Sequence, residues 1–173
     1  MFGNVSNAAP KIFKGGFARC DNLKYAIFNG SERINNKLEL EAKNSVNQWN
    51  GITPYVNIKK GDISTAQIIL DMGRMDPPSP GKLGKTLFVG ADGNNVKTSD
   101  RWVKALCIRF NFDGTKENKY ATTVHEIGHA LSLAHCANAK KHSFHIMHQG
   151  LKDSYKVTKY DKKKLKYKWE KRK

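Results

Sequence analysis

Short apolar stretches bounded by turn residues predict five β-strands in this chain. The clearest case is VKALCIRFNFD at 103–113. Leu106 and Ile108 fall on one face of that predicted strand and Arg109 on the other. The other stretches have the length and residue types of strands, and two of them are separated by the turn sequence GDIS. The five predicted strands cover residues 23–29, 54–60, 65–73, 86–90 and 103–113.

Three segments repeat their apolar residues at helical spacing. The first starts at Ile34, continues to Trp49 and stops before a glycine. The second is KENKYATTVHEIGHALSL at 116–133. The third starts at Thr158, with Asp161 three residues later as its capping partner. These three segments are predicted to be helices.

The segments between these elements are polar or rich in glycine and proline. Residues 1–22 show no periodicity and are expected to form an N-terminal tail, while residues 73–85 form a long loop. A second, polar loop runs to about residue 156. The order strand, helix, several strands, helix, loop, helix fits a mixed sheet with helices packed against it. A length of 173 residues with 39% hydrophobic residues fits one globular domain.

The chain is strongly basic, with a formal net charge of +16. Residues 140–173 hold thirteen Lys or Arg against three Asp or Glu, a net charge of +10. Such a segment attracts polyanions, which include nucleic acid, anionic membrane and anionic cell wall. A solvated surface selected only for solubility is the alternative. The lysines do not follow any specific nucleic-acid-binding motif.

Membrane-spanning and secretory signals are not evident in the sequence. No apolar run reaches the length of about 18 residues that a membrane span needs, and the first residues do not resemble a secretory signal. The three cysteines, Cys20, Cys107 and Cys136, cannot all pair within one chain. Cys107 lies in a predicted strand and is expected to be a small buried apolar residue.

The stretch TTVHEIGHALSLAHC at 122–136 places three histidines and a glutamate within eleven positions. His125 and His129 are four residues apart, so on a helix both rings project from one face. This separation allows two imidazole nitrogens to reach one zinc ion. Glu126 is rotated by about 100° around the helix from His125. It is therefore expected to act as a general base on a water at the metal rather than as a ligand.

A catalytic zinc site usually has three protein ligands and one open position. His135 is the candidate third ligand, and it lies six residues beyond His129. A continuous helix would turn His135 away from the metal. The helix must therefore end near residue 132, where the chain has a serine, and the backbone must turn back.

The segment HEIGHALSLAH resembles the long zinc signature of the metzincin peptidases, HExxHxxGxxH, with Ser132 in place of the usual glycine. Glycine permits a backbone conformation that costs a residue with a Cβ about 1–2 kcal/mol. Met147, in FHIMHQG at 144–150, resembles the methionine that metzincins place under the metal in a tight turn. The similarity is closer to the matrixin-like branch than to the astacins, because Cys136 stands where astacins have a glutamate.

The resemblance implies an α+β fold with a mixed, mostly parallel twisted sheet, two long helices and a zinc cleft. It also implies a single metallopeptidase domain over residues 1–173. Within it, residues 23–135 would form an N-terminal subdomain and residues 136–173 a small basic C-terminal subdomain ending in a helix.

The implied activity is that of a zinc-dependent endopeptidase. One zinc ion would be held by His125, His129 and His135, and Met147 would support the site. Glu126 would take a proton from the attacking water and deliver it to the leaving nitrogen. A protein or peptide substrate would pair with an edge strand, for which GKTLFVG at 84–90 is the candidate.

Two other classes of function remain open. One is a catalytically silent metzincin fold that serves as a binding module, although a silent relative does not need Glu126. The other is a basic polyanion-binding or cell-wall-binding protein with a structural zinc. A closed structural site needs a fourth protein ligand, and Cys136 or a loop histidine would have to supply it. The loop histidines His142, His145 and His148 are expected to be solvated.

Further ions and the location of the protein follow only from the resemblance. Asp92 and Asp76 carry oxygen ligands of the kind that calcium takes, but ADGN at 91–94 is more simply a turn. Residues 51–124 contain no histidine, so a second, structural zinc is not expected. Most metzincins act outside the cell, which implies a secreted protein. We expect a monomer whose basic C-terminal region meets an anionic surface such as cell wall or membrane.

Overall fold

Five strands form one mixed sheet in the computed structural model, which describes residues 11–28, 35–74, 77, 79–136, 144–150 and 155–170. The strand order is β2-β1-β3-β5-β4. All neighbouring pairs are parallel except β4 and β5, which are antiparallel. The strands are β1 (Cys20–Phe28), β2 (Val56–Lys60), β3 (Ile68–Arg74), β4 (Gly84–Val89) and β5 (Lys104–Phe110). The expected mixed, mostly parallel sheet is confirmed, and GKTLFVG provides its antiparallel edge strand.

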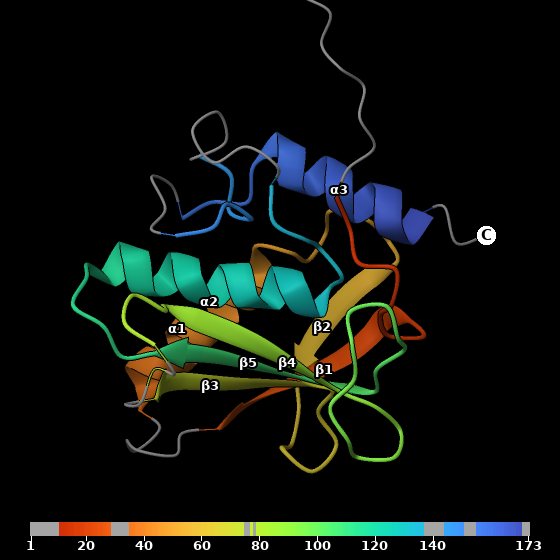
Figure 1. Cartoon of the computed structure of the whole chain (residues 1–173), viewed down its shortest axis with the longest axis horizontal. Helices are drawn as coiled ribbons and strands as arrows, with labels where there is room; N and C mark the ends of the chain where they lie inside the picture. Colours follow the sequence, from red (N-terminus) through yellow and green to blue (C-terminus); the bar gives the residue numbers. More distant parts are fainter. Residues whose placement is uncertain are drawn as a thin grey trace, which may run out of the picture.

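Three helices accompany the sheet: α1 (Asn36–Asn47), α2 (Lys116–Ala130) and α3 (Lys159–Glu170). Helices α1 and α2 pack against each other and cover the same face of the sheet, and α3 lies beyond α2 on the side away from the strands (Figure 1). Each predicted helix is therefore present. No helix within the described ranges combines the length and the apolar character that crossing a bilayer requires.

Local signals set the start of each helix. The side chain of Asn35 accepts hydrogen bonds from the backbone N–H groups of residues 37 and 38, and Thr115 caps α2 in the same way. At the start of α3, Thr158 and Asp161 bond each other's backbone N–H groups. The predicted capping role of Asp161 is confirmed.

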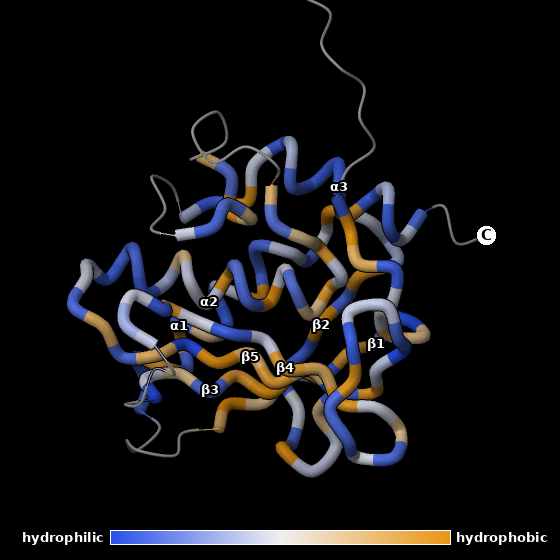
Figure 2. Tube along the Cα trace, viewed as in Figure 1, coloured by the Kyte–Doolittle hydropathy of each residue, from blue (hydrophilic) through white to orange (hydrophobic). Residues whose placement is uncertain are grey.

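The main core lies between the sheet and the two helices that cover it. Apolar residues concentrate along β1, β3 and β5, whereas α3 is mostly hydrophilic (Figure 2). Trp49 follows α1, is fully buried, and donates from its indole N–H to the carbonyl of Val124 in α2. Because β3 lies in the middle of the sheet, all but one of its residues are buried. A smaller apolar cluster around Ile69 covers the other face.

The expectation of a tail up to residue 22 is wrong for residues 11–22. Ile12 forms an antiparallel bridge with Leu133, Phe17 is buried, and β1 begins at Cys20 rather than at residue 23. The sequence gives no sign of this structure, because isolated bridges and two glycines do not produce a regular spacing of apolar residues. The expected loop at 73–85 is also shorter, since β3 extends to Arg74 and β4 begins at residue 84.

The buried ammonium group of Lys168 in α3 fastens this N-terminal segment. Its Nζ donates to three backbone carbonyls, those of Phe13, Lys14 and Gly15. The next residue, Trp169, donates from its indole to the carbonyl of Leu131. The carboxyl-terminal part of α3 thus holds residues 13–15 against the chain that follows α2.

We expect Lys168→Met to lower the free energy of unfolding by about 3 kcal/mol, because three buried carbonyls lose their donor while the apolar stem is kept. Lys166→Met on the exposed face of the same helix is the matched control, and we expect it to change the free energy by less than about 0.5 kcal/mol. Urea denaturation followed by circular dichroism measures both. Equal effects of the two changes would contradict the structural role given to Lys168.

Candidate metal centre

Helix α2 presents His125 and His129 on one face, one turn apart. Both side chains are buried, at 5% and 8% exposure. The Nδ1 atom of His125 lies 2.7 Å from the carbonyl oxygen of Ile146, and that of His129 lies 2.7 Å from the carbonyl oxygen of Leu133. A carbonyl oxygen can only accept, so each Nδ1 is a donor. In the neutral ring Nε2 then carries the lone pair, as a metal ligand requires.

Helix α2 ends where the sequence predicted a break. Ser132 has a φ of 69°, and it is the only residue other than glycine with positive φ in the described part of the chain. The backbone N–H groups of Ser132 and Leu133 donate to the carbonyls of His129 and Gly128, which closes the helix end. The left-handed residue reverses the chain direction and returns His135 toward α2.

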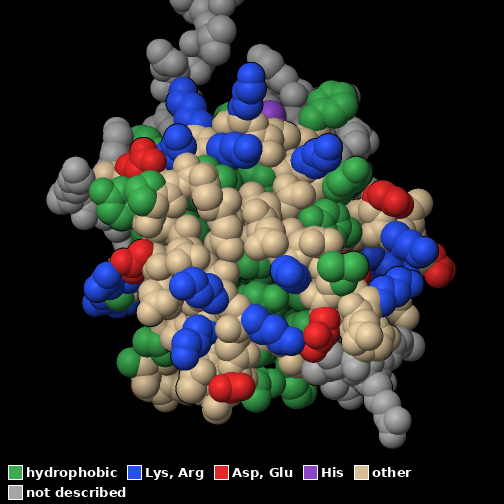
Figure 3. Space-filling model, turned by 180° about the vertical axis from the view of Figure 1, so that it is seen from behind, with side chains coloured by type: hydrophobic (Ala, Val, Ile, Leu, Met, Phe, Trp, Pro, Cys, Tyr) green, Lys and Arg blue, Asp and Glu red, His purple; other side chains and the backbone are tan. Residues whose placement is uncertain are grey.

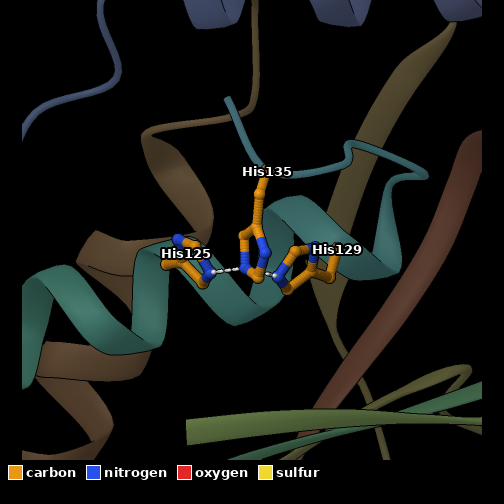
Figure 4. A group of neighbouring side chains, drawn as sticks. All are labelled: His125, His129 and His135. Carbon is orange, nitrogen blue, oxygen red and sulfur yellow. Dashed lines mark hydrogen bonds between the residues drawn. The ribbon is translucent and has the colours of Figure 1, made fainter. Parts of the chain in front are cut away.

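The three histidine rings converge at their Nε2 atoms (Figure 4). The Nε2 of His135 lies 3.2 Å from that of His125 and 3.1 Å from that of His129. Two nitrogens bound tetrahedrally to one zinc at about 2.0–2.1 Å are separated by about 3.3 Å. The observed distances match that value closely. The three histidines are therefore close enough together to bind one metal ion.

The chemistry of this donor set is compatible with a bound cation. The Nε2 atoms of His125 and His129 carry lone pairs because their Nδ1 atoms donate to carbonyls. Both face the Nε2 of His135, which either donates its own proton to them or shares a metal ion with them. Imidazole nitrogens bind zinc, copper, iron and nickel, so the histidines alone do not decide which ion they hold.

A cleft of about 590 Å³ opens over the three histidines. One wall is β4 with the loop before it, and Glu126 also lines the cleft. The Oε2 of Glu126 accepts a hydrogen bond of 2.7 Å from the hydroxyl of Thr86 in β4. Glu126 thus faces the edge strand in the same cavity as the histidines, and its carboxylate is held in place.

Met147 packs against α2 at Gly128 and is fully buried. A Cβ added at Gly128 would come within 2.4 Å of its sulfur and 2.9 Å of the indole of Trp49. Gly128, which precedes His129, is therefore needed for close packing of α2 on Met147. The carbonyl of Met147 also accepts from the N–H of Cys136, next to His135. Met147 contacts the helix turn between the first two histidines and supports the segment of the third.

Asp161 of α3 holds the turn that contains Met147. Its carboxylate is fully buried and accepts hydrogen bonds from the backbone N–H groups of Ile146 and Met147 at 3.1 and 3.4 Å. Since the carbonyl of Ile146 accepts a hydrogen bond from His125, Asp161 positions this candidate metal ligand through the backbone. The sequence identified Asp161 only as a helix cap, because no local pattern marks a contact fourteen residues away.

Phe13 is a cleft residue that the sequence analysis missed. Its ring stacks on His129, with centroids 5.6 Å apart and an interplanar angle of 22°, and contacts Phe88 edge-on. Phe13 also lines the cleft. The sequence analysis did not identify this role, because it assigned residues 1–22 to an N-terminal tail.

The cysteines and the other histidines lie outside the triad. No disulfide joins the three cysteines, all of which lie in the described part of the chain. Cys20 and Cys107 are buried, and burial raises the pKa of the Cys107 thiol far above its usual value. His145 stacks on Tyr160 instead of being solvated as expected. His142 lies outside the described residues. Among the described side chains, the triad is the only group of three or more possible metal ligands, so neither Cys136 nor His148 provides a fourth.

Of the two candidate calcium residues, Asp92 and Asp76, the structure describes only Asp92. Asp92 accepts hydrogen bonds from both the backbone and the side-chain nitrogen of Asn94. This pattern is an Asx turn, so the interpretation of ADGN as a turn is confirmed. Asp76 lies outside the described residues.

No protein-family model matches this chain, and no curated protein matches it in sequence.

We expect the protein to bind one equivalent of Zn²⁺, and His135→Ala to weaken that binding at least 100-fold, because it removes one of three ligands. His145→Ala is the control, since His145 lies outside the triad. Titration against a colorimetric zinc chelator gives the affinities. Equal affinity of His135→Ala and the unchanged protein would rule out the triad as the binding site.

We expect Ser132→Gly to give a higher free energy of unfolding than Ser132→Ala, by about 0.5–1 kcal/mol. Both changes remove the buried hydroxyl, which has no hydrogen-bond partner. Only glycine relieves the left-handed backbone, and the greater freedom of its unfolded chain offsets part of the gain. Thermal denaturation of the two variants tests this. A less stable glycine variant would show that the backbone at 132 is not strained.

Proposed function

We propose that the protein is a zinc-dependent endopeptidase of the metzincin type. The observation that carries the proposal is the convergence of three histidine Nε2 atoms in a cleft that also contains the carboxylate of Glu126. Three imidazole ligands with an adjacent carboxylate are the composition of a hydrolytic zinc site. The left-handed Ser132 and the buried Met147 support the resemblance, because they occupy the positions of the metzincin glycine and methionine.

The chemistry assigned to the protein residues follows from their places in the cleft. Zinc, when bound, supplies a Lewis acid that lowers the pKa of a water toward about 7 and polarises the peptide carbonyl. Glu126 accepts the proton of the attacking water and then donates it to the leaving nitrogen. Thr86 keeps the carboxylate of Glu126 directed into the cleft through its hydrogen bond to Oε2.

The edge strand β4 gives a peptide substrate a place to bind. Its only strand partner in the sheet is β5, although Val89 at its far end also bridges Asn95. Its residues 84–86 line the cleft beside Glu126. An extended peptide laid along β4 would pair with its backbone and carry a carbonyl past the histidines. Gln149 and Gly150, which follow Met147, line the same cleft and would contact the substrate side chain beyond the scissile bond.

The two rival functions have less support from the described residues. A closed structural zinc site needs four protein ligands, and the triad has no fourth among the described side chains. A silent binding module has no use for a carboxylate held beside the histidines. Secretion remains part of the proposal, in keeping with most metzincins.

We expect the purified protein to hydrolyse casein, 1,10-phenanthroline to stop the reaction, and added zinc to restore it. Glu126→Ala should lower the rate by about 100- to 10 000-fold, because the general base is lost, while one equivalent of zinc stays bound. Glu117→Ala, at the exposed start of the same helix, is the matched control and should keep full activity. Zinc binding without cleavage of any protein would instead support the binding module, and full activity of Glu126→Ala would contradict the mechanism.

A further inference from the structure

A second hollow, of about 960 Å³, lies between α3 and the end of α1. Its walls contain lysines from α3, side-chain amides from α1 and the residues that follow it, and two tyrosines. None of the described residues that line it is an aspartate or a glutamate. The lysines are Lys159, Lys162, Lys163 and Lys166.

These four lysines form one face of α3. Positions i, i+3, i+4 and i+7 lie side by side on a helix, and all four side chains are exposed. The opposite face of α3 is buried and holds Asp161, Lys164 and Lys168. The buried face fixes the orientation of α3, so the four exposed lysines stay directed into the hollow.

A third hollow, of about 530 Å³, continues the second one along α1. Asn44 and Tyr120 line both hollows, which therefore adjoin each other, and we call the two together the α1–α3 groove. The third hollow adds four cationic side chains: Lys37, Lys116, Lys119 and Arg109. Seen from behind the view of Figure 1, Lys and Arg side chains outnumber Asp and Glu on the molecular surface (Figure 3).

Arg109 is the buried member of this set. Its side chain is 5% exposed, and its Nε has no hydrogen-bond partner. Its Nε forms an ion pair with a carboxylate oxygen of Glu41 at 3.7 Å. Among the described residues that line the groove, Glu41 is the only acidic one. These lining residues thus comprise eight cations and one carboxylate, and that carboxylate is already paired with Arg109.

Aromatic rings line the part of the groove next to the α3 lysines. Tyr155 is 41% exposed, and Tyr120 contacts it edge-on, with ring centroids 5.8 Å apart. An exposed ring in a cationic groove offers a surface on which a nucleobase can stack. An anionic membrane is flat and has no base that could stack on a ring inside a groove. The carboxylates of an acidic peptide do not stack on a ring either.

The groove and the cleft lie on opposite sides of α2. Tyr120 lines the groove and Thr122 lines the cleft, and two residues along a helix correspond to about 200° of rotation. A ligand in the groove therefore leaves the histidines and Glu126 accessible. Binding there is independent of the peptidase activity proposed above.

We propose that the α1–α3 groove binds single-stranded nucleic acid. The lysines contact the phosphate backbone, and Tyr155 stacks on a base. Recognition by charge and stacking does not depend on base sequence. It also needs no sequence motif, which is consistent with the absence of one.

The test is fluorescence anisotropy of a labelled 20-nucleotide oligothymidylate with the full chain, at 50–300 mM salt. We expect the double change Lys162→Glu and Lys166→Glu to weaken binding at least tenfold. It should also reduce the slope of log affinity against log salt by about 1.4, because two phosphate contacts are lost. The matched control is Lys59→Glu with Lys97→Glu, two exposed lysines outside the groove with the same charge change. It should weaken binding less than threefold.

A third variant separates stacking from charge. Tyr155→Ala should weaken oligothymidylate binding at least fivefold and leave binding of heparin, a polyanion without bases, unchanged. Circular dichroism melting curves confirm that each variant is folded. Absence of binding, equal losses in the two charge variants, or no effect of Tyr155→Ala on oligothymidylate would each overturn the proposal.

Discussion

The convergence of the three histidines depends on one backbone conformation, the left-handed turn at Ser132. Without it, α2 would continue and His135 would point away from His129. The turn is stabilised by hydrogen bonds from the N–H groups of Ser132 and Leu133 to carbonyls at the end of α2. The carbonyl of Ser132 in turn accepts from Phe13, and that of Leu133 bonds His129. A single residue with positive φ therefore links the helix end, the N-terminal segment and two of the three histidines.

Buried polar side chains of α3 stabilise the Met147 turn, the chain that follows α2 and the N-terminal segment. Asp161 accepts from the backbone around Met147, Lys164 donates to the carbonyl of Ala134, and Lys168 donates to three carbonyls of the N-terminal segment. Burial lowers the pKa of Lys164, so holding its charge there costs free energy. A hydrophilic helix can still act as a core element, because its charged groups form hydrogen bonds with buried backbone atoms that no other element pairs.

The sequence predicted the parts of the structure that depend on local pattern. Apolar periodicity identified the three helices and one strand, and residue types with turn signals identified the other strands. The spacing of His125 and His129 placed both on one face of α2, and the helix was expected to end near residue 132. What it missed are contacts between segments far apart in the chain. The bridge between Ile12 and Leu133 brings Phe13 to His129. Gly128 is required because Met147 and Trp49 pack closely against it. Neither relation leaves a period or a motif in the sequence.

The contacts of Lys168 with residues 13–15 join positions 153 to 155 residues apart. Such contacts cannot form before residue 168 has been synthesised. A ribosome-bound chain that has already completed the sheet, α1 and α2 still lacks the groups that hold the Met147 turn and the N-terminal segment. The histidines would therefore reach their final arrangement only after α3 has emerged. Binding of a metal ion by the triad would then follow synthesis of α3 rather than guide the folding of the sheet.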